Sequence, residues 1–268
     1  MKYQRELTAA VLIPAVLAIL LVAPPWAWAL LVALAAGLAL VEFYRLIAAA
    51  GWVVPRVAGI GVFLAACAAA HLGSTAGLLG AAAAGLVLLP TLVLLASPPV
   101  GVLLASSSAS VFSTLYVALG GAAMIALRSV GWRAVMFVLA VVWVGDSAAY
   151  YVGRRFGKRK LAPAISPKKT WEGLWGQLGA GLVVGLLARL LLFPSGNVPG
   201  LALLGLAVAG LAVVGDLLES SFKRSCDLKD SGSLLPGHGG FLDRLDSLLY
   251  VSPLVLAVAF FLPEVLPR

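Results

Sequence analysis

Long apolar runs separated by short polar stretches repeat from one end of the chain to the other. Three of these runs, 7–23, 78–96 and 201–214, contain no charged residue. Helices of a soluble protein would carry polar faces at helical spacing, whereas a run of about 20 apolar residues is long enough to cross a bilayer. The pattern therefore predicts an all-α, polytopic integral membrane protein.

About nine transmembrane helices are expected from the positions of these runs. They cover residues 7–23, 27–47, 57–72, 77–96, 100–126, 132–152, 172–193, 200–222 and 247–262. The third is short, and only Ser97, Pro98 and Pro99 separate the fourth from the fifth, so eight or ten helices are alternatives. Residues 27–29 also match a signal-peptide cleavage site, but the length of the first run and the eight runs after it favour a retained helix.

Basic residues indicate the orientation, because cytoplasmic loops of membrane proteins are enriched in Lys and Arg. With a cytoplasmic N-terminus, fifteen basic residues fall on the cytoplasmic side and three on the other side. The fifteen are Lys2, Arg5, Arg45, Arg56, Arg154, Arg155, Lys158, Arg159, Lys160, Lys168, Lys169, Lys223, Arg224, Lys229 and Arg244, and the three are Arg128, Arg133 and Arg268. We therefore expect a protein of the cell (inner) membrane whose N-terminus faces the cytoplasm.

Composition agrees with this interpretation and excludes other classes. Of the 268 residues 62% are apolar and only 11% are charged, which is unusual for a soluble domain. The two cysteines, Cys67 and Cys226, lie far apart and indicate neither a disulfide framework nor a metal site. The net charge of +8 suits anionic lipid headgroups, and without a module that reads nucleic acid we expect no nucleic acid partner.

Acidic residues gather in the second half of the chain. All of them except Glu6, Glu42 and Glu264 lie between residues 146 and 246. We therefore expect an N-terminal half of about five helices, residues 1–127, and a C-terminal half, residues 128–268, that carries the chemistry. Glu42 is expected to form a structural ion pair with Arg45, three residues further along the same helix.

The predicted topology places most of these acidic residues at the cytoplasmic face, where we expect the active site. They are Asp146, Glu172, Asp216, Glu219, Asp243 and Asp246. Asp216 and Glu219 share a helix face, and Asp243 and Asp246 do so if a helix begins after Gly240. Because a charge in a membrane needs a partner, a cavity or a bound ion, these carboxylates predict a cation site that holds phosphate oxygens.

Two polar segments indicate how phosphates would be bound. Residues 166–173 place two lysines and two hydroxyl residues at the start of the seventh helix, whose free N–H groups form an anion site. Residues 215–246 combine glycines, which let the backbone approach a phosphate, with alternating carboxylates and cations. Such an alternation can hold both a metal ion and the anion that it neutralises.

The second segment resembles the signature of the phosphatidate cytidylyltransferases, also called CDP-diacylglycerol synthases. The residues that match at the spacing of this signature are Ser221, Lys223, Arg224, Lys229, Asp230, Gly232, Leu235, Pro236, His238, Gly239, Gly240, Phe241, Asp243, Arg244, Leu245 and Asp246. Residues 166–173 and 146–150 also look like motifs of this family. The resemblance covers residues 140–250, and the first five helices match only in general character.

The resemblance implies a nucleotidyltransferase that joins CTP to phosphatidic acid, giving CDP-diacylglycerol and pyrophosphate. It also implies a magnesium requirement, room for a second cation, and a homodimer. On this basis Asp216, Asp243 and Asp246 are the expected metal ligands and, together with Lys223 and Arg224, the expected catalytic residues. The expected substrate-binding residues are Ser166, Lys168, Lys169, Thr170, Glu219, Lys229, Asp230, His238, Gly239, Gly240 and Arg244, with Asp146 and Tyr150 as accessory residues.

Three alternatives differ in the features that they require. A related cytidylyltransferase acting on another lipid phosphate would share all of these motifs. A CDP-alcohol phosphotransferase would need an Asp-Gly-x-x-Ala-Arg core, which this chain lacks. A transporter would permit acidic residues in the membrane, but the charges here cluster at one face and no paired interrupted helices mark a midplane site.

Overall fold

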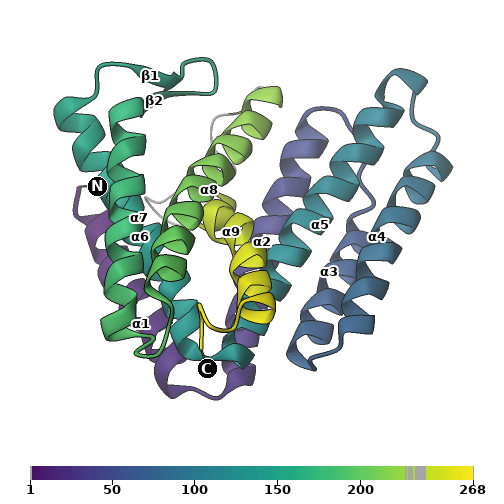
Figure 1. Ribbon diagram of the computed structural model, residues 1–268. Coiled ribbons are helices and arrows are strands. Elements are labelled where there is room, and N and C mark those ends of the chain that lie inside the picture. Colours follow the sequence, from purple (N-terminus) through teal and green to yellow (C-terminus); the bar gives the residue numbers. More distant parts are fainter. Residues whose placement is uncertain (1, 227, 229–231, 233–239, 268) are drawn as a thin grey trace. The chain divides into compact units, whose positions relative to one another are not determined.

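The computed structural model (Figure 1) describes residues 2–226, 228, 232 and 240–267. Within these residues the chain forms nine helices and one two-stranded antiparallel sheet. The helices are α1 (Lys2–Val22), α2 (Pro25–Ala49), α3 (Arg56–His71), α4 (Thr75–Leu95), α5 (Val100–Val130), α6 (Trp132–Phe156), α7 (Trp171–Leu191), α8 (Val198–Ser225) and α9 (Leu242–Phe261). The strands are β1 (Lys160–Ala162) and β2 (Ser166–Thr170).

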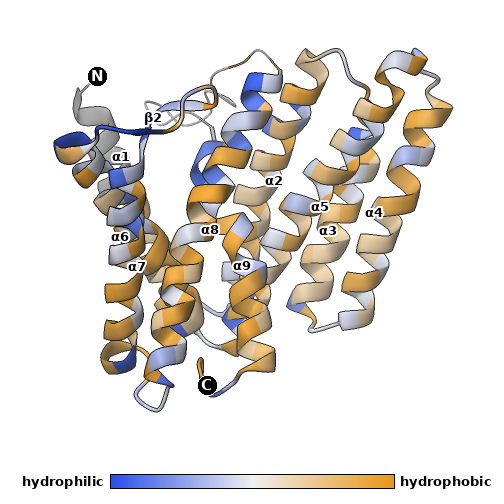
Figure 2. Cartoon of the chain, turned by 45° about the horizontal axis from the view of Figure 1, so that its top comes forward, coloured by the Kyte–Doolittle hydropathy of each residue, from blue (hydrophilic) through white to orange (hydrophobic). Residues whose placement is uncertain are grey.

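Each helix overlaps one of the predicted spans, which confirms an all-α, polytopic integral membrane protein. Among the described residues, seven helices, α2 and α4–α9, are long and apolar enough to cross a membrane. The other two apolar helices, Val11–Val22 of α1 and α3, are shorter. Figure 2 shows apolar residues along most of the helices and hydrophilic residues in the hairpin and at helix ends. The hairpin itself was not predicted.

Two glycines end helices α2 and α3 in the same way. Gly51 and Gly73 have φ angles of 77° and 68°, a left-handed conformation that glycine adopts without strain. One residue further on, the N–H of Trp52 donates to Ile47 O and the N–H of Ser74 donates to Ala69 O. These bonds satisfy carbonyl groups in the last turns of the helices, as in a Schellman motif, and they set the short loops between α2, α3 and α4.

The chain divides into two compact units, which are described separately. The first unit contains Met1–Ala126 and Phe222–Leu245, and the second contains Leu127–Ser221 and Asp246–Arg268. One break lies beside the border expected at 127–128. Residues 222–245, which carry most of the signature, group with the N-terminal helices of the first unit.

Buried hydroxyl groups hold the helices of the first unit together. Ser106 and Ser110 of α5 are fully buried; the Ser106 hydroxyl accepts a hydrogen bond from Val53 N at 3.0 Å, and the Ser110 hydroxyl donates to Val53 O at 3.3 Å. Tyr44 of α2 and Thr114 of α5 share a hydrogen bond of 2.7 Å between their hydroxyl groups. These bonds satisfy polar groups that cannot reach water and fix α2 and the α2–α3 loop against α5.

Candidate active site

The hairpin that carries the predicted phosphate-binding segment is tied to the start of α7. Thr170 ends β2 and caps α7, because its hydroxyl accepts a hydrogen bond from Gly173 N at 3.1 Å. Glu172, in the first turn, accepts hydrogen bonds from the backbone N–H groups of Lys158 and Arg159 at 3.1 and 3.3 Å. The predicted helix start is therefore confirmed, and its capping groups also hold the basic turn that precedes β1.

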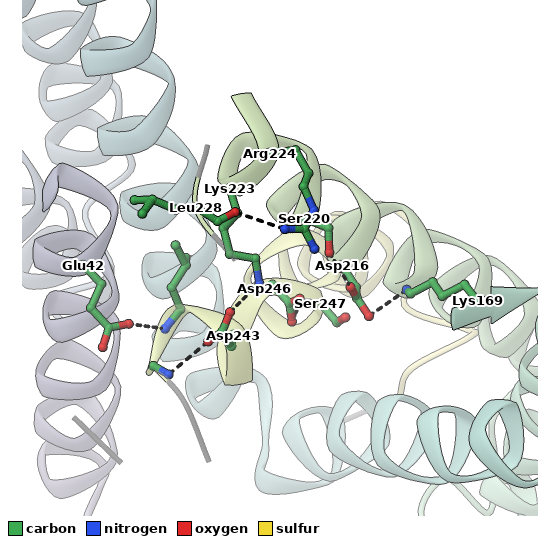
Figure 3. A network of polar contacts seen from close by, with 12 residues as sticks. Glu42, Lys169, Asp216, Ser220, Lys223, Arg224, Leu228, Asp243, Asp246 and Ser247 are labelled. Atoms are coloured by element: carbon green, nitrogen blue, oxygen red, sulfur yellow. Dashed lines mark hydrogen bonds and ion pairs between the residues drawn. The ribbon is translucent and has the colours of Figure 1, made fainter. Parts of the chain in front are cut away.

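Lys169 of β2 connects the hairpin to α8 within the second unit. Its Nζ lies 2.6 Å from Asp216 Oδ2, and both side chains are accessible to solvent, at 24% and 40% (Figure 3). The other carboxylate oxygen of Asp216 accepts a hydrogen bond from the Ser220 hydroxyl at 3.3 Å. The structure thus brings together two predicted site residues that are 47 positions apart (216 − 169), whereas Lys168 of the same strand is exposed.

Asp246 of α9 lies close to Asp216 because α8 has no side chain at Gly215. A Cβ added to Gly215 would lie 2.8 Å from Tyr250 Cβ and 3.2 Å from Asp246 O. Asp246 is only 7% exposed, accepts a 2.6 Å hydrogen bond from Ser247 N, and is within electrostatic range of Asp216. Ser247 fixes this turn, since its hydroxyl donates to Ala212 O on α8 at 3.0 Å.

Gln177 contacts a predicted site residue but was not itself predicted from the sequence. It is buried on α7, at 3% exposure, and its Nε2 donates to Asp146 Oδ1 of α6 at 3.2 Å. Asp146 is also within electrostatic range of Asp246. Gln177 therefore holds one oxygen of the accessory carboxylate of Asp146. The signal that could have revealed it is that Gln177 is the one uncharged polar residue in the apolar, glycine-rich run 172–193.

Two further predicted residues of the second unit have different surroundings. Glu219 is buried on α8, with 4% exposure, although it lies only three residues from the accessible Asp216. Tyr150 is 58% exposed, and its hydroxyl accepts a hydrogen bond from Arg154 Nη1 of the same helix at 3.1 Å. Asp216 is therefore the more accessible carboxylate of α8.

In the first unit, Lys223 and Asp243 form a second lysine–carboxylate contact. Lys223 Nζ lies 2.6 Å from Asp243 Oδ1, and the side chains are 12% and 13% exposed (Figure 3). Asp243 Oδ2 accepts a hydrogen bond from Gly240 N at 3.0 Å, so this carboxylate also fixes the turn that leads into α9. Helix α9 begins at Leu242, before the predicted span 247–262, so Asp243 and Asp246 both lie on it. Arg224 donates through Nη1 to Leu228 O at 3.2 Å, and Arg244 is exposed.

The predicted ion pair between Glu42 and Arg45 is wrong, and the contact that Glu42 makes instead was not predicted. Its side chain is fully buried and its Oε2 accepts a hydrogen bond from Leu242 N, the first residue of α9, at 2.9 Å. Arg45, the expected partner, is exposed and does not form a salt bridge with Glu42 among the described residues. An exposed Arg45 gains more from hydration than from reaching a buried carboxylate.

Four predicted substrate-binding residues, Lys229, Asp230, His238 and Gly239, lie outside the described residues. Within the part of the chain that the structure describes, no group of three or more Asp, Glu, His or Cys side chains is arranged as a metal cage. In the second unit, Asp216 and Asp146 are each within electrostatic range of Asp246. Metal binding by Asp216, Asp243 and Asp246 stays a prediction.

These features describe a polytopic membrane protein with carboxylates and lysines in contact near helix ends. Residues 3–262 match the model of the cytidylyltransferase family. Because this match includes nearly the whole chain, the protein belongs to the cytidylyltransferase family.

Proteins named phosphatidate cytidylyltransferase are similar to parts of the chain. The one from Staphylococcus epidermidis is 42% identical over 143 residues, which cover 53% of this chain and 55% of that protein. The one from Staphylococcus aureus is 43% identical over 145 residues, covering 53% and 55%. The one from Haemophilus influenzae is 44% identical over 130 residues, covering 47% and 45%. The chain thus spans about half the length of the curated relatives that it matches.

Proposed function

We propose that this protein is a phosphatidate cytidylyltransferase, which converts CTP and phosphatidic acid into CDP-diacylglycerol and pyrophosphate. The observation that carries the proposal is the signature at residues 221–246, in a chain whose residues 3–262 match the cytidylyltransferase family. The relatives named phosphatidate cytidylyltransferase support phosphatidic acid as the acceptor.

The reaction needs little acid–base chemistry from the protein. A phosphate oxygen of phosphatidic acid attacks the α-phosphorus of CTP and forms a new P–O bond. The bond from the α-phosphorus to the bridging oxygen breaks, and pyrophosphate leaves with the electron pair. Because the second pKa of a phosphomonoester is about 6, the attacking oxygen is largely deprotonated near neutral pH. We therefore do not assign a general base, and His238 is not needed as one.

Catalysis then depends on holding two anionic substrates in line and on neutralising their phosphate oxygens. Lys169 suits this role, because its contact with Asp216 is open to solvent and a phosphate oxygen can replace that partner. Ser166 and Lys168 of the same strand would add a hydroxyl group and a second charge. Lys223 is held by Asp243 with little exposure and would provide a fixed positive charge.

The second unit offers oxygen ligands that suit magnesium. Asp216 and Asp246 lie on helices that approach closely at Gly215, and Mg²⁺ usually takes one or two carboxylates together with waters and substrate phosphates. A cage of three side chains is therefore not required. Asp216 and Asp246 would hold the ion, and Asp243 stays a predicted ligand. When bound, Mg²⁺ neutralises charge on the phosphate oxygens of the nucleotide.

We further propose an inner-membrane location with a cytoplasmic N-terminus and active site, and a homodimer. The orientation is supported by the fifteen basic residues that it places on the cytoplasmic side. The homodimer follows from the family resemblance, and native mass spectrometry in detergent would measure it. A mass equal to one chain at working concentrations would contradict the dimer.

A lipid panel tests the choice of substrate. Purified full-length protein in detergent would be incubated with Mg²⁺, labelled CTP, and either phosphatidic acid, an archaeal-type ether-lipid phosphate, or diacylglycerol. We expect labelled lipid with phosphatidic acid and none with diacylglycerol, which lacks the attacking phosphate. Product with only the ether-lipid phosphate would identify a related cytidylyltransferase. Absence of product with every lipid would contradict the proposal.

A further inference from the structure

Glu42 is a fully buried carboxylate in the N-terminal part of the chain, far in sequence from the signature. It lies on α2, seven residues before the end of that apolar helix. A charged side chain within a membrane protein is costly to bury and is kept only with specific partners. The partners of this carboxylate therefore indicate why an acidic residue occupies the position.

One contact of Glu42 is with the first residue of α9. Leu242 N donates to Glu42 Oε2 at 2.9 Å across 200 residues of sequence (Figure 3). The N–H groups in the first turn of a helix have no acceptor within the helix, and Leu242 is itself fully buried. Glu42 thus supplies an acceptor that water cannot supply, and its negative charge suits the positive end of the helix dipole.

Other contacts tie the same part of α2 to the signature. The backbone at Gly232 approaches Glu42 so closely that an added Cβ would lie 2.6 Å from Oε1. Phe43, the next residue on α2, contacts Phe222 with ring centroids 5.2 Å apart. Two adjacent residues of α2 therefore contact residues 222, 232 and 242, near the start, in the middle and near the end of the segment that matches the signature.

The hydrogen bond to Glu42 lies next to the contacts of Asp243. Asp243 follows Leu242 directly, and its carboxylate contacts both Lys223 Nζ and Gly240 N. A shift of Leu242 would move the backbone of Asp243 and lengthen at least one of these contacts, which are 2.6 and 3.0 Å. The position of the Asp243 carboxylate therefore depends on an acceptor that α2 supplies.

We propose that Glu42 is a positioning residue: by accepting the Leu242 N–H it holds the first turn of α9 and thereby orients Asp243 and Lys223. This inference rests on the proposed function only for its effect on turnover, since the placement of the helix start can be measured without substrate. It assigns a catalytic consequence to the N-terminal half, for which the sequence predicted no function beyond membrane embedding.

Three variants separate this role from a general effect on folding. Glu42→Leu removes the acceptor and replaces it with an apolar side chain of similar size. Glu42→Gln keeps an oxygen that can accept the Leu242 N–H but removes the charge. Arg45→Gln is the matched control, because it changes a charged residue of the same helix whose side chain is exposed.

The first measurement is hydrogen–deuterium exchange of peptides that contain Leu242, on purified full-length protein in detergent. We expect faster exchange in Glu42→Leu and exchange like that of the unaltered protein in Glu42→Gln and Arg45→Gln. Unchanged exchange in Glu42→Leu would overturn the proposal. Exchange is measured without substrate, so a failure of the positioning role of Glu42 can be distinguished from a failure of the proposed activity.

The second measurement is steady-state kinetics with CTP and phosphatidic acid. Glu42→Leu should lower kcat by about 10-fold to 100-fold, the equivalent of one hydrogen bond to a charged group, with little change in either KM. Glu42→Gln should recover most of the activity. Equal losses of kcat in both variants, or an unchanged kcat in Glu42→Leu, would overturn the proposal.

Discussion

Two lysine–carboxylate contacts of equal length differ in how far they are open to solvent. Lys169 and Asp216, in the second unit, are 24% and 40% exposed, whereas Lys223 and Asp243, in the first unit, are 12% and 13% exposed. Both nitrogen–oxygen distances are 2.6 Å. The charges are therefore equally close, and the difference in their energetics comes from the surrounding medium.

This difference indicates separate roles for the two contacts. Water screens an exposed ion pair, so the Lys169–Asp216 pair contributes about 0–1 kcal/mol and can be exchanged for a phosphate or a cation. The Lys223–Asp243 pair is shielded, and Asp243 also accepts the Gly240 N–H, so breaking it leaves a poorly hydrated charge. We interpret the first pair as open to ligands and the second as part of a fixed frame.

The largest expected effect is the loss of activity in Asp243→Asn. The amide cannot neutralise Lys223 or bind a cation as a carboxylate does, so CTP-dependent product should fall by about 100-fold to 1,000-fold or more. The fold should be retained, because the amide oxygen can still accept the Gly240 N–H. The control is Glu264→Gln, the same change at an exposed acidic residue. Near-normal activity at saturating Mg²⁺ would remove Asp243 from the metal site.

A smaller loss of activity is expected when the positive charge of Lys169 is removed from the exposed Lys169–Asp216 contact. Lys169→Gln should lower kcat/KM for CTP by about 10-fold to 100-fold, the size of one charge-assisted hydrogen bond. Lys168→Gln, at the exposed neighbour in the same strand, should cost less, because Lys168 forms no salt bridge within the described part of the chain. Initial rates over a range of CTP concentrations would measure both. A larger loss in Lys168→Gln would reverse their assigned importance.

Thermal unfolding in detergent distinguishes the shielded Lys223–Asp243 contact from the exposed Lys169–Asp216 contact. Lys223→Met removes the partner of a shielded carboxylate, and the midpoint should fall by about 2–10 °C for a loss of about 1–3 kcal/mol. Lys169→Met should leave the midpoint within about 1 °C, because exposed pairs add little stability. Equal shifts in the two variants would show that the exposure of the contacts does not determine their roles.

The smallest expected effect concerns Gln177, which donates to Asp146. Gln177→Leu should keep the packing of α7 against α6 but release the Asp146 carboxylate, and kcat should fall by about 3-fold to 10-fold, equivalent to one ordinary hydrogen bond. Steady-state rates at saturating CTP and lipid would measure the change. A loss as large as that of Asp243→Asn would give Asp146 a direct catalytic role.

Features that depend on local sequence could be predicted well. The run 172–193 became α7, Trp171–Leu191, because its length and hydropathy suit a membrane span and Thr170 can cap its first turn. Asp216 and Glu219 were expected on one helix, and both are on α8. Each of these results depends on residues within a few positions of one another.

Features that depend on distant contacts could not be predicted. Strands β1 and β2 are only 3 and 5 residues long, too short to show the alternation by which a strand is recognised. Glu42 and Leu242 are separated by 200 residues, and a glutamate three residues before an arginine on one helix suggested a simpler partner. The difference in side-chain exposure between Lys223 and Lys169 likewise depends on packing between helices.

The fate of each phosphate of CTP is the most direct test of nucleotidyl transfer. Two parallel reactions with purified protein, Mg²⁺ and phosphatidic acid would use CTP labelled at the α-phosphate or at the γ-phosphate. We expect the α label to appear in lipid and the γ label in pyrophosphate, in equal amounts and only when phosphatidic acid is present. Transfer of the γ label to lipid, or release of either label without lipid, would contradict the proposed reaction.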